Sequence, residues 1–186
     1  MQEKENVIRI LRETLDAMKM ENIIRLKDLS DQTIHTASVA QDPDNIAVAI
    51  IVYGLSKILE RQGYRQRPGW DKFYKNAILQ LEHSIDALKK NDDTHLREHL
   101  ENINKKIGGI SGKLKGYIQD VFGKASINKA SKIYEHGISM EQTAKLLGVS
   151  QYDLANYAGT RYISDFPLSR TVSVKDRIKL AMRMFE

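Results

Sequence analysis

The feature that most constrains the fold is the helical spacing of apolar residues along most of the chain. Its clearest instance lies between residues 70 and 88, where apolar side chains recur every three or four residues and therefore share one helix face. These residues are Trp70, Phe73, Tyr74, Ala77, Ile78, Leu81, Ile85 and Leu88. The 186 residues include only three prolines and few runs in which apolar and polar residues alternate as in a β-strand. The sequence therefore predicts an all-α protein.

The N-terminal part of the chain is expected to form a helical bundle. Apolar residues spaced by three and four from Ile8 to Met18, and again toward Leu29, predict one long amphipathic helix. A shorter helical piece is expected over residues 31–39. Basic and acidic side chains are equally numerous between residues 1 and 29, so the outer face of the long helix is expected to be a solvated ion-pair surface.

A buried helix is predicted next, with a clear start. Asp42 can accept an amide hydrogen bond at the helix cap, and Pro43 suits the first helical position. Apolar residues surround the segment 46–59 on all sides, so it is expected at the centre of the bundle. Beyond the 70–88 stripe, a further helix over residues 92–107 is expected to be interrupted at the glycine pair 108–109.

Gly123 is predicted to divide the chain into two domains. Residues 1–123 would form the bundle, for dimerisation or sensing, and residues 124–186 a tri-helical helix-turn-helix unit followed by a terminal basic helix. The net charge of +5 supports the division, since the second part carries ten Lys and Arg against six Asp and Glu. A basic excess of this kind favours a polyanionic partner.

Two capping patterns define the expected helices of the C-terminal unit. After a helix over residues 124–136, Ser139 and Gln142 have the spacing of a capping box, and Ser150 and Asp153 repeat the pattern for a helix that Gly159 is expected to end. A steep crossing of two short helices needs small residues at the contact, a glycine in the turn and apolar residues behind the second helix. The residues in those places are Ala144, Gly148, Leu147, Val149 and Leu154.

The stretch from Met140 to Ala158 resembles the helix-turn-helix of repressor and Cro-like proteins. Extended back through KASKIYEHGISMEQTAKLLGVSQYDLANYAG, it also resembles the small antitoxins that pair with PIN-domain ribonuclease toxins. The resemblance covers about 35 residues. It implies a DNA-binding fold for this unit and, through the antitoxins, a nuclease as a second kind of partner.

A helix that enters the major groove would present its first turns to the bases. Gln151 and Asn156 could each pair with adenine, and Tyr152 could reach a phosphate or a thymine methyl. Asp153 would repel phosphate unless it serves as a helix cap. The predicted DNA-binding residues are Ser150, Gln151, Tyr152 and Asn156 at the reading face, with Lys145, Arg161, Arg170, Lys175, Arg177 and Lys179 for phosphates.

Three other stretches have motif-like spacing and are expected to be structural. HLREH, from His95 to His99, has the spacing of some zinc peptidase sites, but no third ligand is recognisable. GGISGKLKG, at residues 108–116, lacks the spacing of a phosphate-binding loop and is expected to be a joint between helices, with non-specific phosphate contact by the lysines around it as an open alternative. In RQGYRQRPGWDKFYK, the aromatic residues open the 70–88 stripe and are expected in the core, with Arg65 and Arg67 at the surface.

The expectations about location and cofactors rest on two features that the sequence does not contain, cysteine residues and a long apolar run. The absence of cysteine excludes disulfides and thiolate metal sites and favours the cytoplasm. The longest apolar run, residues 46–55, is too short to span a membrane. No cofactor and no catalytic or metal-binding residue is predicted.

The sequence therefore predicts a cytoplasmic, dimeric DNA-binding transcriptional regulator, because two short recognition helices bind palindromic DNA better than one. Two alternatives stay open. One is an antitoxin-like module that binds and inhibits a partner nuclease. The other is a helical RNA-processing enzyme, whose cleavage would depend on His95 or His99.

Overall fold

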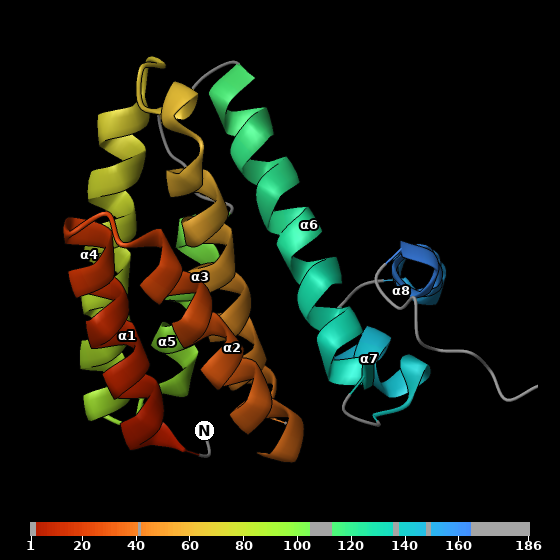
Figure 1. Ribbon diagram of the computed structural model, residues 1–186. Coiled ribbons are helices and arrows are strands. Elements are labelled where there is room, and N and C mark those ends of the chain that lie inside the picture. The colour runs from red at the N-terminus through yellow and green to blue at the C-terminus, as the bar shows by residue number, and fades with distance from the viewer. Residues whose placement is uncertain (1–2, 41, 105–112, 136–137, 148–149, 165–186) are drawn as a thin grey trace, which may run out of the picture.

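The described part of the protein is helical and contains no strand, as predicted. The computed structural model describes residues 3–40, 42–104, 113–135, 138–147 and 150–164. Helices α1 to α5 form a bundle, α6 leans against one side of it, and α7 and α8 lie beside one end of α6 (Figure 1). The helices are α1 (Lys4–Lys19), α2 (Ile23–Ala40), α3 (Pro43–Glu60), α4 (Trp70–Lys89), α5 (Asp93–Asn104), α6 (Lys113–Glu135), α7 (Met140–Leu147) and α8 (Gln151–Ser164), with a short 3-10 helix, η1 (Gln62–Tyr64).

The expected buried helix and the expected apolar stripe are both present. Asp42 caps α3 by accepting a hydrogen bond from the Asp44 amide at 2.9 Å, and Pro43 follows at the first position. Most of α3 is buried on all sides, at the centre of the bundle. In α4, Trp70 and Phe73 begin the buried face, which continues through Leu88. These two helices contribute to one large apolar core that reaches from α1 to α6.

A single long N-terminal helix was predicted, and the structure shows two. The chain reverses after Lys19, where Glu21 adopts a positive φ of 54° and the Asn22 amide bonds back to the Ala17 carbonyl at 2.8 Å. Asn22 then accepts a hydrogen bond from the amide of Arg25, which starts α2. The separate piece predicted over residues 31–39 is therefore the second half of α2.

Helix α6 also differs from the prediction, because it begins at Lys113 and not near residue 124. The helix passes through Gly123 without interruption. A glycine inside a helix costs about 1 kcal/mol, and burial of Phe122 and Ala125 on either side offsets that cost. The predicted division at residue 123 thus falls within a helix, and the two-domain organisation stays a prediction.

Two further differences concern helix α8 and the arginines near residue 65. Helix α8 continues to Ser164, past the end predicted at Gly159, since glycine keeps both backbone hydrogen-bonding groups and can continue a helix. Arg65 and Arg67 are partly buried instead of fully exposed. Arg65 bonds Glu21 at 2.6 Å, and the Arg67 guanidinium lies 4.8 Å from the centre of the Tyr117 ring.

Polar contacts fix the ends of the bundle helices. The guanidinium of Arg97 in α5 donates to both carboxylate oxygens of Asp44, at 2.7 and 2.9 Å. Asp44 is buried in the first turn of α3, where a carboxylate also faces the positive end of the helix dipole. This pair holds α5 against the start of α3.

Helix α6 is attached to the bundle by a buried cation. The side chain of Lys129 is 0% exposed, and its Nζ lies 2.8 Å from Asp31 Oδ1 on α2 and 4.2 Å from the centre of the Tyr53 ring on α3. Lys132 contacts the same Asp31 oxygen at 2.6 Å. Burial acts to raise the pKa of Asp31, but the hydrogen bonds and charges of the two lysines prevail and hold that pKa below its ordinary value.

Apolar contacts accompany this polar attachment. A small cluster of buried residues joins α2 and α3 to the end of α6 and the segment that follows it, and consists of Ile34, Ala37, Ile46, Ala49, Ile133 and Ile138. Toward the other end of α6, the ring of Phe122 lies directly against the backbone of Gly54 on α3. No helix of the described residues is long and apolar enough to cross a membrane.

The close approach at Gly54 generates a prediction about stability. A methyl group added at Gly54 would overlap the ring of Phe122, whereas one added at Gly123 would meet no atom within 4 Å. We expect Gly54→Ala to lower the free energy of unfolding by about 1–3 kcal/mol, because the ring or α3 must move. Urea unfolding followed by circular dichroism measures the change.

Gly123→Ala is the matched control for this prediction. It adds the same methyl group to a helix surface, and we expect it to raise the free energy of unfolding by up to about 1 kcal/mol through helix propensity. Equal effects of the two substitutions would contradict the proposed contact between α3 and α6.

Candidate nucleic-acid interface

Helices α7 and α8 are each started by a serine, as their sequence spacing predicts. The Gln142 amide donates to Ser139 Oγ at 3.1 Å at the start of α7. At the start of α8, the Asp153 amide donates to Ser150 Oγ at 3.0 Å, and the Ser150 hydroxyl donates to the Asp153 carboxylate at 2.6 Å. Asp153 is therefore engaged in capping its own helix, the role that the sequence offered as an explanation for an acid at this position.

A small apolar cluster packs α7 and α8 against α6. It consists of Ala130, Ala144 and Leu154, which are at most 5% exposed, with Met140 at its edge. Ala144 and Leu154 were both expected at this contact. Gly148 and Val149 lie outside the described residues, as does the side chain of Leu147, so their expected roles stay predictions.

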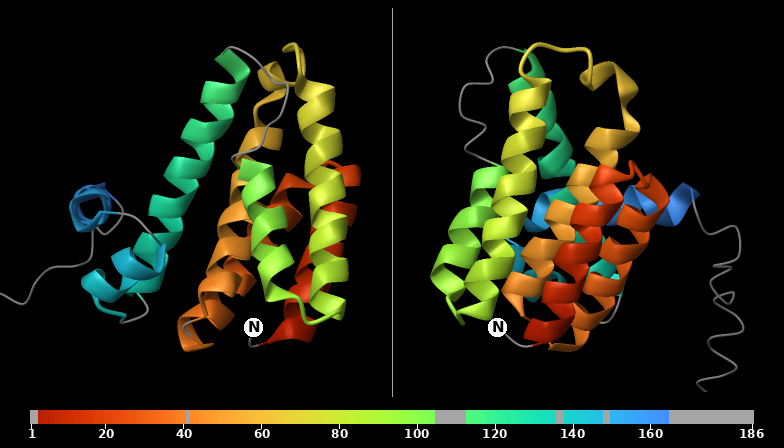
Figure 2. Two further views of the ribbon diagram at one scale, coloured as in Figure 1. Left: turned by 180° about the vertical axis from the view of Figure 1, so that it is seen from behind. Right: turned by 90° about the vertical axis from the view of Figure 1, so that its left-hand side faces the viewer.

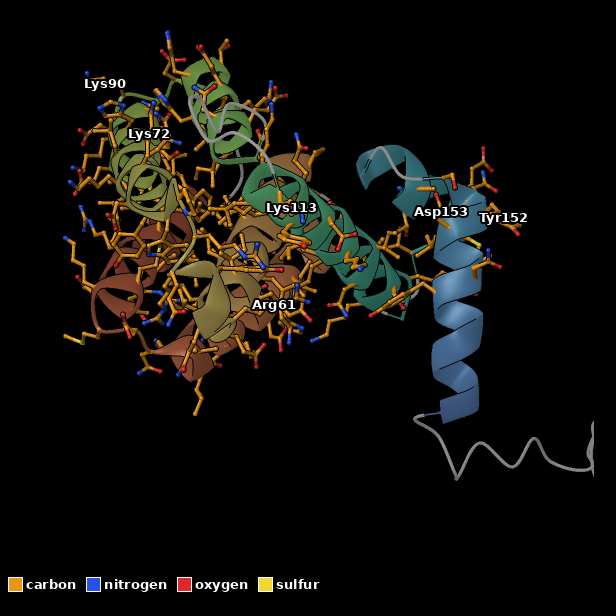
Figure 3. The ribbon with its side chains drawn as sticks, turned by 90° about the horizontal axis from the view of Figure 1, so that it is seen from above. Arg61, Lys72, Lys90, Lys113, Tyr152 and Asp153 are labelled. Atoms are coloured by element: carbon orange, nitrogen blue, oxygen red, sulfur yellow. The ribbon has the colours of Figure 1, made fainter. Side chains whose placement is uncertain are left out.

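The first turns of α8 present their polar side chains outward. Gln151, Tyr152 and Asn156 are exposed, with Tyr152 at 75%, while Leu154 between them is fully buried. In Figure 3, Tyr152 lies at the outer edge of the molecule, on the side of α8 away from the bundle, and Asp153 lies at the start of the same helix. The left view of Figure 2 places α8 clear of α4 and α5. A groove of DNA or the surface of a protein could therefore reach this face.

The predicted phosphate contacts lie outside what the structure describes. Lys145 belongs to α7 and Arg161 to α8, but their side chains are not among the described ones. The other predicted cations lie outside the described residues altogether, and they are Arg170, Lys175, Arg177 and Lys179. Among the side chains described on α7 and α8, Glu141 and Asp153 carry charge and none is basic. The structure thus brings together the predicted base-reading residues and leaves the phosphate contacts as a prediction.

The histidines of the HLREH stretch have separate hydrogen-bond partners. His95 Nδ1 lies 2.5 Å from Asp92 Oδ2, and His99 Nδ1 lies 2.9 Å from Gln80 Oε1. Burial, with His83 nearby, lowers the pKa of His99. Within residues 3–40, 42–104 and the described parts that follow, no group of three or more acidic or histidine side chains is arranged to hold a metal ion.

The two other motif-like stretches lie outside α7 and α8. Most of the glycine-rich segment at 108–116 lies outside the described residues, and Lys113 and Lys115 are exposed at the start of α6. In the stretch from residue 61 to residue 75, Trp70 and Phe73 are core residues, as expected.

Sequence reasoning missed the buried lysine of α6. Lys129 lies four residues from both Ala125 and Ile133, so it occupies an apolar stripe position where a buried side chain is expected. That register was visible in the sequence. The partner, Asp31, was not, because it lies 98 residues away on another helix.

Comparison with family models, with curated proteins and with solved structures finds no match to this chain. The resemblance of the α7–α8 stretch to repressors and to antitoxins therefore stays a prediction from its residues. The geometry of the site carries the functional argument.

The capping geometry predicts how α8 is stabilised. Ser150→Ala removes the acceptor for the Asp153 amide, and we expect the free energy of unfolding to fall by about 1 kcal/mol. Amide hydrogen exchange should show lost protection in α8, since its first turn then lacks a cap.

Ser126→Ala is the matched control, because Ser126 lies inside α6, where its hydroxyl donates to the Phe122 carbonyl at 3.1 Å and caps no helix. We expect little change in stability there. A loss in Ser126→Ala as large as in Ser150→Ala would be inconsistent with a special role for the cap.

Proposed function

We propose that the protein is a dimeric transcriptional regulator of the cytoplasm that binds double-stranded DNA through the exposed face of α8. The observation that carries the proposal is the orientation of this helix. Its apolar side, at Leu154, is packed against α6 and α7, while Gln151, Tyr152 and Asn156 face outward. A recognition helix requires this arrangement, since its first turns must reach base edges in the major groove.

The chemistry of the outward side chains suits base reading. The amides of Gln151 and Asn156 each combine a donor and an acceptor, the pair that adenine presents in the major groove. The Asp153 carboxylate accepts a hydrogen bond from the Ser150 hydroxyl, and the Asp153 amide donates to Ser150 Oγ, so the negative charge is held at the start of the helix. Tyr152 is exposed beside it and can donate its hydroxyl to a phosphate.

Affinity for the phosphate backbone would come from the basic residues around and beyond α8. Lys145 and Arg161 belong to α7 and α8, and the residues after 164 include a run of lysines and arginines. A dimer places two such units on one duplex, which compensates for the few contacts that a single short helix can make.

A substitution at the reading face tests this function. We expect Gln151→Ala or Asn156→Ala to weaken binding to the preferred DNA by about 1–3 kcal/mol, because each removes one pair of hydrogen bonds to a base. Binding to a duplex of unrelated sequence should change little. Fluorescence anisotropy with a duplex from the region upstream of the protein's own gene measures both affinities.

Gln119→Ala is the control, since Gln119 is an exposed glutamine on α6, away from the reading face. It should leave both affinities unchanged. The affinity of the wild type should also fall steeply with salt, as expected where phosphate contacts release counterions. Absence of salt-sensitive binding to any duplex would refute the proposal.

One observation favours a second candidate, a module that binds and inhibits a partner nuclease. Tyr152 is 75% exposed next to Asp153, on a face where no described side chain is basic. Exposed tyrosines are enriched in protein interfaces. On this alternative, the chain would co-purify with the product of a neighbouring gene and would show no salt-sensitive binding to DNA. Tyr152→Ala would abolish the co-purification.

A further inference from the structure

A pocket lies between the bundle and the C-terminal helices, apart from the reading face of α8. It has a volume of about 420 Å³ and is formed by α3 and the residue after it, by α6, and by one residue of α8. Its polar and aromatic lining consists of Tyr53, Lys57, Glu60, Arg61, Lys124, Asn128 and Tyr157. The volume is within the range of pockets that bind small molecules.

The pocket contains a buried polar atom without a partner. Asn128 is 8% exposed, and its Nδ2 donates to the Tyr157 hydroxyl at 2.7 Å. Its Oδ1 is buried and accepts no hydrogen bond from any described residue. Because an unsatisfied buried oxygen costs free energy, its presence in a pocket wall indicates a place for a ligand's N–H or O–H donor.

The charges around the pocket favour an anion. Three cations line it, and one of them, Lys124, pairs with Asp120 at 2.8 Å. The one carboxylate of the lining, Glu60, is shared between Lys27 at 2.7 Å and Lys57 at 2.9 Å. These two hydrogen bonds lower the pKa of Glu60, so it stays ionised and neutralises only part of the positive charge. Arg61 donates to the hydroxyl of Tyr64, and no carboxylate among the described residues pairs with it. Arg61 thus contributes a positive charge to the pocket lining that no carboxylate among the described residues balances.

Two tyrosines supply flat surfaces within the same pocket. Tyr53 and Tyr157 are both partly buried and lie on different helices, α3 and α8. Aromatic rings in a pocket lining favour a flat, unsaturated ligand, because stacked rings bury more surface than a flexible chain does.

We propose that this pocket binds a small anion that carries a flat ring and an N–H donor, the combination that a nucleoside monophosphate presents. The phosphate would lie at Arg61, Lys57 and Lys124, and the donor would bond Asn128 Oδ1. This binding does not depend on the proposed function. Should that function hold, the ligand would contact α8 through Tyr157 and so reach the same helix that faces DNA.

Calorimetric titration of the full chain with adenosine monophosphate at low salt tests the site without using DNA. We expect saturable binding of one nucleotide per chain and an affinity about tenfold lower in Arg61→Gln, because an exposed charge-assisted contact is removed. Lys72→Gln is the matched control. Lys72 is an exposed lysine on α4, far from Arg61 in Figure 3, and its loss should leave the affinity unchanged.

Changing the ligand instead of the protein tests the phosphate contact and the N–H donor contact separately, without any risk to folding. Adenosine, which lacks the phosphate, should bind at least tenfold more weakly. Purine riboside monophosphate, which lacks the exocyclic amine, should bind several-fold more weakly, since Asn128 Oδ1 would stay unsatisfied.

Three results would overturn the proposal. They are absence of saturable nucleotide binding at millimolar concentration, equal losses in Arg61→Gln and Lys72→Gln, and equal affinities for the three ligands. If Arg61→Gln weakens the binding of the chain to duplex DNA while no nucleotide binds, the cations of the pocket are DNA phosphate contacts and the small-molecule site is excluded. Nucleotide binding without DNA binding would refute the regulator and keep the site.

Discussion

The buried ammonium of Lys129 is the interaction on which the arrangement of the C-terminal helices depends. A lysine with 0% exposure is stable only when its charge is compensated, and Asp31 on α2 and the ring of Tyr53 on α3 provide that compensation. Both partners belong to the bundle, whereas Lys129 belongs to α6. The requirement to pair this charge therefore fixes the rotation and the height of α6 against α2 and α3, which apolar contacts alone specify less strictly.

The two proposed surfaces depend on the position of α6. Helices α7 and α8 pack on its C-terminal half through Ala130, so a fixed α6 determines which face of α8 points outward. The same helix forms one wall of the pocket, because Asn128, the residue before Lys129, is part of the lining. The proposed reading face and the proposed ligand pocket thus share one support. This sharing gives a physical route by which a small molecule could influence α8, through Tyr157 and its hydrogen bond with Asn128.

Local signals in the sequence predicted the helical fold, the caps of α3, α7 and α8 and the exposed face of α8, but not the bounds of α1, α2 and α6 or the long-range pairs. Asp42, Ser139 and Ser150 were identified as caps because capping depends on residues only a few positions apart. The turn at Glu21 was missed, since a non-glycine residue at positive φ leaves little trace in a sequence. Gly123 and Gly159 were taken as helix ends, although packing and backbone bonding carry helices through both. Asn128 and its unsatisfied oxygen are defined by three helices together, which no local pattern reports.

The dependence on the buried lysine is tested most directly by the stability of Asp31→Asn as a function of pH. Because the pKa of Asp31 is lowered in the folded protein, its contribution is present above the ordinary aspartate pKa of about 4 and is lost as the pH falls through the folded value. At pH near 7 the variant should be less stable than the wild type by about 1–3 kcal/mol, the cost of leaving a buried donor poorly paired. This difference should shrink as the pH falls below about 4. A difference near zero at neutral pH, or one that does not change with pH, would contradict the account.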